Sequence, residues 1–183
     1  MKKLVIVISS PPGSGGTTVA KKLAKKLRMK FFSVGLFYKK LSKEKSQSKA
    51  AFELWKTKYG SSEKLHKHMD KMQVEIARKG NVVIESTLGI HFLKRLSKHK
   101  IWLDVPLKVR AERHAKRDNI PEGEALKQID KIEEIERSEW KRMYGFDYFD
   151  QKFDADFVLD SSKLTISQTV KRILEFIKGR KQD

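Results

Sequence analysis

The sequence contains no cysteine, which excludes disulfides, thiolate catalysis and cysteine-ligated zinc. Its five histidines do not have the spacing typical of metal ligands. No segment approaches the length of a membrane span, and the apolar run near the start is too short for a signal peptide. We therefore expect a cytoplasmic protein that has no membrane partner.

Acidic residues are scarce: 23 Asp and Glu stand against 41 Lys and Arg, which gives a net charge of +18. A field of this strength attracts polyanions, of which nucleic acid is the commonest in cells. Four basic stretches suit a large phosphate surface better than a single mononucleotide, so the charge favours binding to structured RNA. We expect no sequence-specific readout of bases and no specificity for DNA. The residues expected to contact RNA are Lys21, Lys22, Lys25, Lys26, Arg28, Lys39, Lys40, Lys43, Lys56, Lys58, Lys94, Arg95, Lys98, Lys171, Arg172, Arg180 and Lys181.

Short apolar runs alternate with stretches of helical periodicity along the chain. Residues 4–8 form a continuous β-branched run that is typical of a buried parallel strand. Similar runs follow at residues 31–34, 82–84, 101–105 and 155–159. Alternation of this kind predicts an α/β fold, a parallel sheet with helices on both faces. At 183 residues the chain is long enough for one domain and short for two.

The stretch SPPGSGGTT, residues 10–18, lies where a phosphate-binding loop would follow the first strand. Against the template G-x-x-x-x-G-K-[ST], Ser10 replaces the first glycine and Gly16 replaces the lysine. The pattern leaves three interpretations open. The loop binds an anion weakly through its N–H groups, or Lys21 or Lys22 substitutes for the missing lysine, or the loop is a structural relic.

Several motifs in order resemble the small archaeal-type cytidylate kinases, a group of P-loop nucleoside monophosphate kinases. They are PPGSG-x-TTVA, a D-x-x-Q helix, GNVVIES, IWLDVPLKVRAERHAKRD, YGFD and ADFVLDSS. The resemblance implies a P-loop NTPase fold of one domain with a five-stranded parallel sheet. Its core would comprise residues 1–35 and 81–183, with a helical insert at 36–80 and a short lid at about 114–124.

The resemblance also implies a role for particular residues. Mg²⁺ would contact Thr17, and Arg110, Arg113 and Arg117 would close over the phosphates. The monophosphate site would include Asp70 and Gln73, which would contact cytosine, and Glu85. The residues implied for ATP are Gly13, Ser14, Gly15, Gly16, Thr17 and Thr18.

The chain departs from the family pattern where positive charge is expected. Gly16 replaces the loop lysine, Thr87 an arginine and Leu36 an aspartate. The helix after the lid carries Ile132, Ile135 and Glu139 where a serine and two arginines are usual, although Arg137 and Arg142 lie nearby.

Loss of an arginine clamp costs about 10³–10⁵ in the rate of phosphoryl transfer. The departures therefore favour a catalytically inactive protein, monomeric and without a cofactor, that binds structured RNA, with ribosomal RNA or a ribosomal subunit as the partner. The alternative is an ATP- and Mg²⁺-dependent (d)CMP kinase. A third possibility is a regulatory subunit that binds a nucleotide without chemistry.

Overall fold

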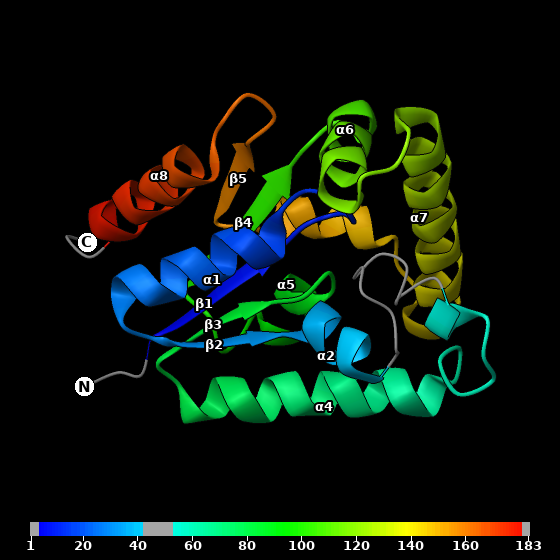
Figure 1. The fold of residues 1–183 in the computed structure, drawn as a ribbon. Helices are drawn as coiled ribbons and strands as arrows, with labels where there is room; N and C mark the ends of the chain where they lie inside the picture. The colour runs from blue at the N-terminus through cyan, green and yellow to red at the C-terminus, as the bar shows by residue number, and fades with distance from the viewer. Residues whose placement is uncertain (1–3, 42–52, 181–183) are drawn as a thin grey trace.

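A computed structural model describes residues 4–41 and 53–180, and its centre is a five-stranded parallel sheet (Figure 1). The strand order is β2-β3-β1-β4-β5. The central β1 pairs with β3 on one side, Val7 opposite Ile84, and with β4 on the other. The strands are β1 (Val5–Ser9), β2 (Lys30–Ser33), β3 (Val82–Glu85), β4 (His99–Asp104) and β5 (Phe157–Asp160).

Helices cover both faces of the sheet, because successive residues of β1 point to opposite sides. Ile6 and Ile8 pack in one core cluster with α1 and α8, whereas Val5 and Val7 belong to a second cluster on the other face. The second cluster includes residues of α4, α5, α7 and η1. These elements are α1 (Gly16–Leu27), α4 (Glu63–Lys79), α5 (Gly89–Leu93), α7 (Glu122–Tyr144), η1 (Tyr148–Asp154) and α8 (Ile166–Gly179).

Two further helices are α2 (Val34–Leu41) and α6 (Leu107–Asp118). Pro106 and Pro121 directly precede α6 and α7, in keeping with the preference for proline at helix starts. Thr165 and Gln168 form a capping box that begins α8. The turn between α6 and α7 is short, because Asn119 ends α6 in a left-handed conformation and α7 begins three residues later.

The predicted fold class is confirmed, with small shifts at the strand ends. The strand predicted at 31–34 ends at Ser33, since Val34 already begins α2. The strand predicted at 155–159 begins at Phe157, because η1 runs on to Asp154. The division into core, insert and lid stays a prediction. Part of the insert, with Lys43, and the C-terminal Lys181 lie outside the described residues.

Among the helices in residues 4–41 and 53–180, none combines the length and the apolar character needed to cross a bilayer.

Candidate active site

A cleft of about 800 Å³ opens where the loop after β1 meets α2, α4 and α7. Loop residues from Ser10 to Thr18 line one part of it, and Glu85, at the end of β3, lines another. This is the edge at which open parallel sheets bind ligands, outside the carboxyl ends of the strands. The loop and the cleft together are therefore the candidate site.

The loop between β1 and α1 depends on two glycines with positive φ, Gly13 (φ 83°) and Gly15 (φ 88°). Gly13 also packs closely, since a Cβ there would lie 2.7 Å from Ile129 Cδ1. Gly15 is the N-cap of α1 and provides no side-chain hydrogen bond, and the first turn contains no acidic residue. The N-terminus of α1 therefore presents main-chain N–H groups and a positive dipole end to the cleft, an arrangement that suits phosphate.

The two departures from the loop template lie against each other. A Cβ on Gly16 would lie 2.8 Å from Ser10 Oγ, which is shorter than an ordinary contact. The serine at the first template position therefore occupies space that a side chain at position 16 would need. The two replacements form one local packing arrangement.

Glu85 joins the loop to β2 through its carboxylate. Its Oε2 accepts hydrogen bonds from Thr17 Oγ1 at 3.1 Å and from Ser33 Oγ at 2.5 Å. Burial raises the pKa of Glu85, while the two hydroxyl donors act in the opposite direction. A hydroxyl and a carboxylate at this spacing are oxygen ligands of the kind that Mg²⁺ takes, with substrate phosphates and water completing the shell. The described residues contain no group of three or more His, Cys, Asp or Glu side chains suited to a metal.

The three arginines expected to close over the phosphates have different positions. Arg110 is 3 % exposed and does not line the cleft. Its Nη1 donates to the Pro12 carbonyl at 3.0 Å, and its Nη2 pairs with Glu133 at 2.7 Å. Arg110 therefore anchors the loop from behind.

Arg113 and Arg117 do line the cleft. Arg113 Nη1 donates to the Ser14 carbonyl of the loop at 3.0 Å, and its Nη2 donates to the Ser161 carbonyl after β5. Lys21, on α1, also lines the cleft. Three cationic side chains therefore face the space beside the phosphate loop although the template lysine is absent.

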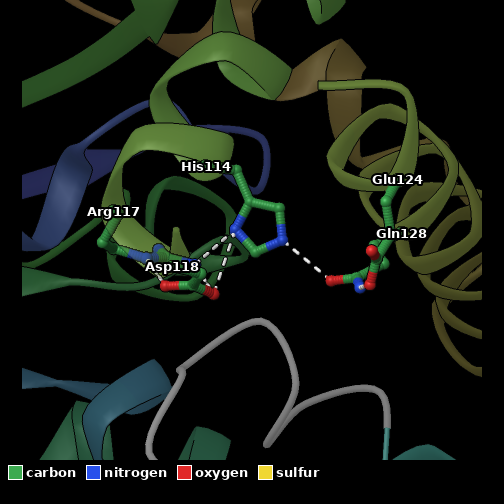
Figure 2. Close-up of polar contacts among 5 residues, drawn as sticks. All are labelled: His114, Arg117, Asp118, Glu124 and Gln128. Carbon is green, nitrogen blue, oxygen red and sulfur yellow. Dashed lines mark hydrogen bonds and ion pairs between the residues drawn. The ribbon is translucent and has the colours of Figure 1, made fainter. Parts of the chain in front are cut away.

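A chain of polar contacts joins α6 to α7 (Figure 2). Arg117 Nη2 lies 2.6 Å from His114 Nδ1, and His114 Nε2 lies 3.0 Å from Gln128 Oε1 on α7. Because arginine has only donors, Nδ1 accepts and Nε2 carries the proton. Gln128 in turn donates to Glu124, and Arg117 pairs with Asp118. Arg117 is thus oriented by a buried histidine that is hydrogen-bonded to α7.

Asp70 lines the cleft on α4, and its carboxylate accepts from Tyr144 Oη at 2.5 Å and from Gln73 Nε2 at 3.2 Å. Burial raises the pKa of Asp70 to about 6. Gln73 is buried and does not line the cleft. Its role in the site is to orient the Asp70 carboxylate through the hydrogen bond from its amide.

Most of the departures from the family pattern do face the cleft. Thr87, Leu36 and Ile132 line it. Glu139 pairs with Arg142 at 2.8 Å, away from the lining. Arg137 pairs with Asp147 and likewise does not line the cleft.

Sequence reasoning missed a group of cleft residues on the insert and α7. Tyr38 Oη lies 3.0 Å from His66 Nδ1, and His66 Nε2 lies 2.9 Å from the Gly60 carbonyl. Glu136 and Trp140 of α7 complete this wall. One signal was available, because Glu136 interrupts an otherwise apolar helical stripe. The buried residues of that stripe are Ala125, Ile129, Ile132, Glu136 and Trp140.

Fold and cleft together define a P-loop kinase architecture. Solved structures with the same arrangement include an uncharacterised protein from Eubacterium ventriosum, with TM-score 0.72 and 18 % identity over 97 % of this chain and 99 % of that one. Shikimate kinase from Aquifex aeolicus matches with TM-score 0.63 and 22 % identity over 97 % and 98 %. At this identity the likeness shows the fold.

Within that class, the chain belongs to the cytidylate kinase-like family, whose model matches residues 5–163. A cytidylate kinase of Ignicoccus hospitalis is 38 % identical over 93 % of this chain and 98 % of its own length. Cytidylate kinases of Pyrococcus horikoshii (38 % over 88 % and 81 %) and Methanocaldococcus jannaschii (35 % over 87 % and 89 %) are similarly close. The predicted family is confirmed.

These relatives overturn the expectation of a catalytically inactive RNA-binding or ribosomal protein, since they are named as kinases and span most of this chain. The expectation of a non-enzyme was wrong because it gave the charges missing from template positions more weight than the cationic side chains that remain. Arg113, Arg117 and Lys21 line the cleft and supply cations from other positions.

The residues assigned to RNA lie on several elements, and some of them have intramolecular partners. Lys22 Nζ donates to Ser167 Oγ at 2.6 Å, and Lys56 pairs with Glu53. Arg180 pairs with Asp156 at 2.9 Å. Basic clusters in the sequence therefore serve in part to join neighbouring elements of the fold.

Proposed function

We propose that this protein is a cytidylate kinase, which transfers the γ-phosphoryl group of ATP to CMP or dCMP. The observation that carries the proposal is a glycine loop at the N-terminus of α1, in a cleft that Arg113, Arg117 and Lys21 also line. The extent of the match to named cytidylate kinases supports the same conclusion.

Phosphoryl transfer requires positioning and positive charge more than covalent chemistry. The loop amides and Lys21 would hold the ATP phosphates, and Arg113 and Arg117 would face the phosphoryl group as it passes between the nucleotides. An acceptor phosphate oxygen of CMP attacks the γ-phosphorus, and ADP leaves with the electrons of the broken bond. Arg113 is held by the Ser14 carbonyl, so its orientation is coupled to the shape of the loop.

Mg²⁺ would neutralise charge on the phosphates of ATP. Thr17 Oγ1 is the side-chain oxygen placed to contact it, and Glu85 orients that hydroxyl by accepting its proton in a hydrogen bond. Asp70, supported by Gln73 and Tyr144, would contact the cytosine of the acceptor.

A coupled assay with ATP, Mg²⁺ and CMP or dCMP tests the proposal. We expect turnover in the ordinary enzyme range, roughly 1–10³ s⁻¹. Thr17→Val, which removes the hydroxyl but keeps the shape, should lower kcat/KM by about 10- to 100-fold, as expected for a hydrogen bond or ligand of about 1.5–3 kcal/mol to a charged group. Thr17→Ser keeps the hydroxyl and is the matched control. Absence of turnover with every nucleoside monophosphate would refute the proposal.

A further inference from the structure

Glu136 is an acid buried in the apolar stripe of α7, and it forms part of the cleft wall. It is 7 % exposed and lines the cleft together with Ile132 and Trp140 of the same helix. Burying a carboxyl group costs free energy unless it is hydrogen-bonded. An acid in this position therefore needs partners.

The structure provides a partner for one of its two oxygens. The Trp55 side chain donates a hydrogen bond to Glu136, and the indole N–H is the donor available. Oε2 has no hydrogen-bond partner within the described residues. The carboxyl group thus keeps an unpartnered oxygen in the wall of a cleft.

The surroundings of Glu136 keep it protonated. Burial, and secondarily the charge of Glu133, raise its pKa to about 8, while the bond from Trp55 acts in the opposite direction. Glu133 is itself paired with Arg110. Because the Trp55 N–H requires an acceptor, Oε1 acts as the carbonyl oxygen and Oε2 carries the proton. The other titratable groups packed around this side chain are Tyr38 of α2, His66 of α4 and Tyr148 of η1.

This part of the cleft suits a base better than a phosphate. Tyr38 interacts electrostatically with both Asp70 and Glu136, so the two acids lie near the same phenol. Trp55 stacks on His66 with ring centroids 4.5 Å apart, and Trp140 lies edge-on to Trp55. Figure 1 shows α7 running from the lid, beside α6, to the level of α4, so the helix reaches both parts of the site. Carboxyl and aromatic groups add no positive charge for a phosphate, but they provide hydrogen bonds and apolar surface for a nucleobase.

We propose that Glu136 is a specificity-determining residue that reads the base of the acceptor nucleotide, its Oε2–H donating to the ring nitrogen N3 of cytosine. The proposal rests on the proposed cytidylate kinase function. Cytosine N3 is a hydrogen-bond acceptor, whereas uracil carries N–H at that position, so a fixed donor accepts the first base and rejects the second. When uracil binds, the buried O–H of Glu136 has no acceptor at N3, and an unpaired buried polar group of this kind is the origin of strong discrimination.

Substitution at position 136 tests the proposal through the ratio of kcat/KM for CMP to that for UMP. We expect Glu136→Met to reduce this ratio at least about tenfold at pH 7, as loss of one discriminating hydrogen bond implies. Glu136→Gln should keep it, because the amide oxygen accepts from Trp55 and the amide N–H₂ donates permanently to the base. Glu134→Gln, an exposed acid on the same helix, is the matched control.

The pH profile separates base reading from a structural role. Between pH 7 and pH 9 the wild-type ratio should fall, since ionised Glu136 loses its donor and becomes an acceptor that tolerates uracil. In Glu136→Gln the ratio should stay constant over this range. The range lies above the pKa of Asp70, which is about 6, so that titration does not interfere. A Glu136→Met protein with wild-type selectivity, or a Glu136→Gln protein that titrates like the wild type, would overturn the proposal.

Calorimetric titration with CMP and UMP distinguishes this proposal from the kinase function. Preferential CMP binding that Glu136→Met abolishes would support the base-reading role even without turnover, a result that would refute only the kinase proposal. Turnover with unchanged selectivity in the variant would refute only the role of Glu136. If the wild type binds CMP and UMP equally or not at all, the base-reading role is wrong.

Discussion

The pair formed by Ser10 and Gly16 shows how the effect of a substitution on stability depends on the neighbouring residue in a packed loop. A Cβ added at residue 16 would lie only 2.8 Å from Ser10 Oγ. A serine rotamer change or a backbone shift is therefore needed before residue 16 can carry a side chain. Interiors resist such insertion, at a cost of about 1–3 kcal/mol.

We expect Gly16→Lys alone to lower the free energy of unfolding, and Ser10→Gly to relieve that loss when the two are combined. The coupling energy between the two sites should be about 0.5–3 kcal/mol, the range found for residues in contact. Urea denaturation of the two single variants and the double variant measures it. Strictly additive effects would show that the close approach in the structure carries no energy.

The same residues explain what the sequence could reveal of the site. The loop glycines, Thr17 and Asp70 occupy positions that the motifs indicated, because backbone shape and strand order are encoded locally. Arg110 was expected to close over the phosphates, yet it lies behind the loop, since only tertiary packing decides which face of α6 meets the cleft. Glu136 was missed because a single acid in an apolar stripe has no motif, although its position in the stripe was visible.

At the scale of elements, the fold followed from the alternation of strands and helices, whereas the contact between α6 and α7 did not. Five buried runs and the helices between them determine a parallel sheet with little ambiguity. The short turn between α6 and α7 is held by side chains that are 14 residues apart in sequence, His114 and Gln128. No periodicity predicts such a contact.

We expect Gln128→Leu to weaken the orientation of Arg117, because it removes the partner of the His114 N–H and leaves that buried group unpaired. Loss of a hydrogen bond of about 1 kcal/mol corresponds to roughly a fivefold fall in kcat/KM. Steady-state kinetics with ATP and CMP measures the change. Glu124→Gln is the control, since it keeps an acceptor for the Gln128 amide.

Unchanged kinetics in Gln128→Leu, with a lowered melting temperature, would mean that the polar chain in Figure 2 stabilises the packing of α6 on α7 without positioning Arg117.

For the whole molecule, the excess of positive charge affects the stability of the fold. The 41 basic side chains outnumber the 23 acidic ones by 18, so ion pairs cannot neutralise this excess. Several of the ion pairs are exposed, and exposed pairs contribute little to stability because solvent screens them. Repulsion among like charges therefore opposes the compact state.

We expect added salt to stabilise this protein, because the Debye length falls from about 10 Å at 0.1 M to about 3 Å at 1 M and screens repulsion across the surface. A gain of about 1 kcal/mol would raise the melting temperature by about 2–4 °C for a chain of this size. Thermal denaturation in increasing sodium chloride measures the shift. Chloride is preferable to sulfate, since sulfate would bind at the phosphate loop and stabilise through the site itself. A melting temperature that falls with chloride would show that attraction within the ion pairs outweighs the repulsion of the excess lysines.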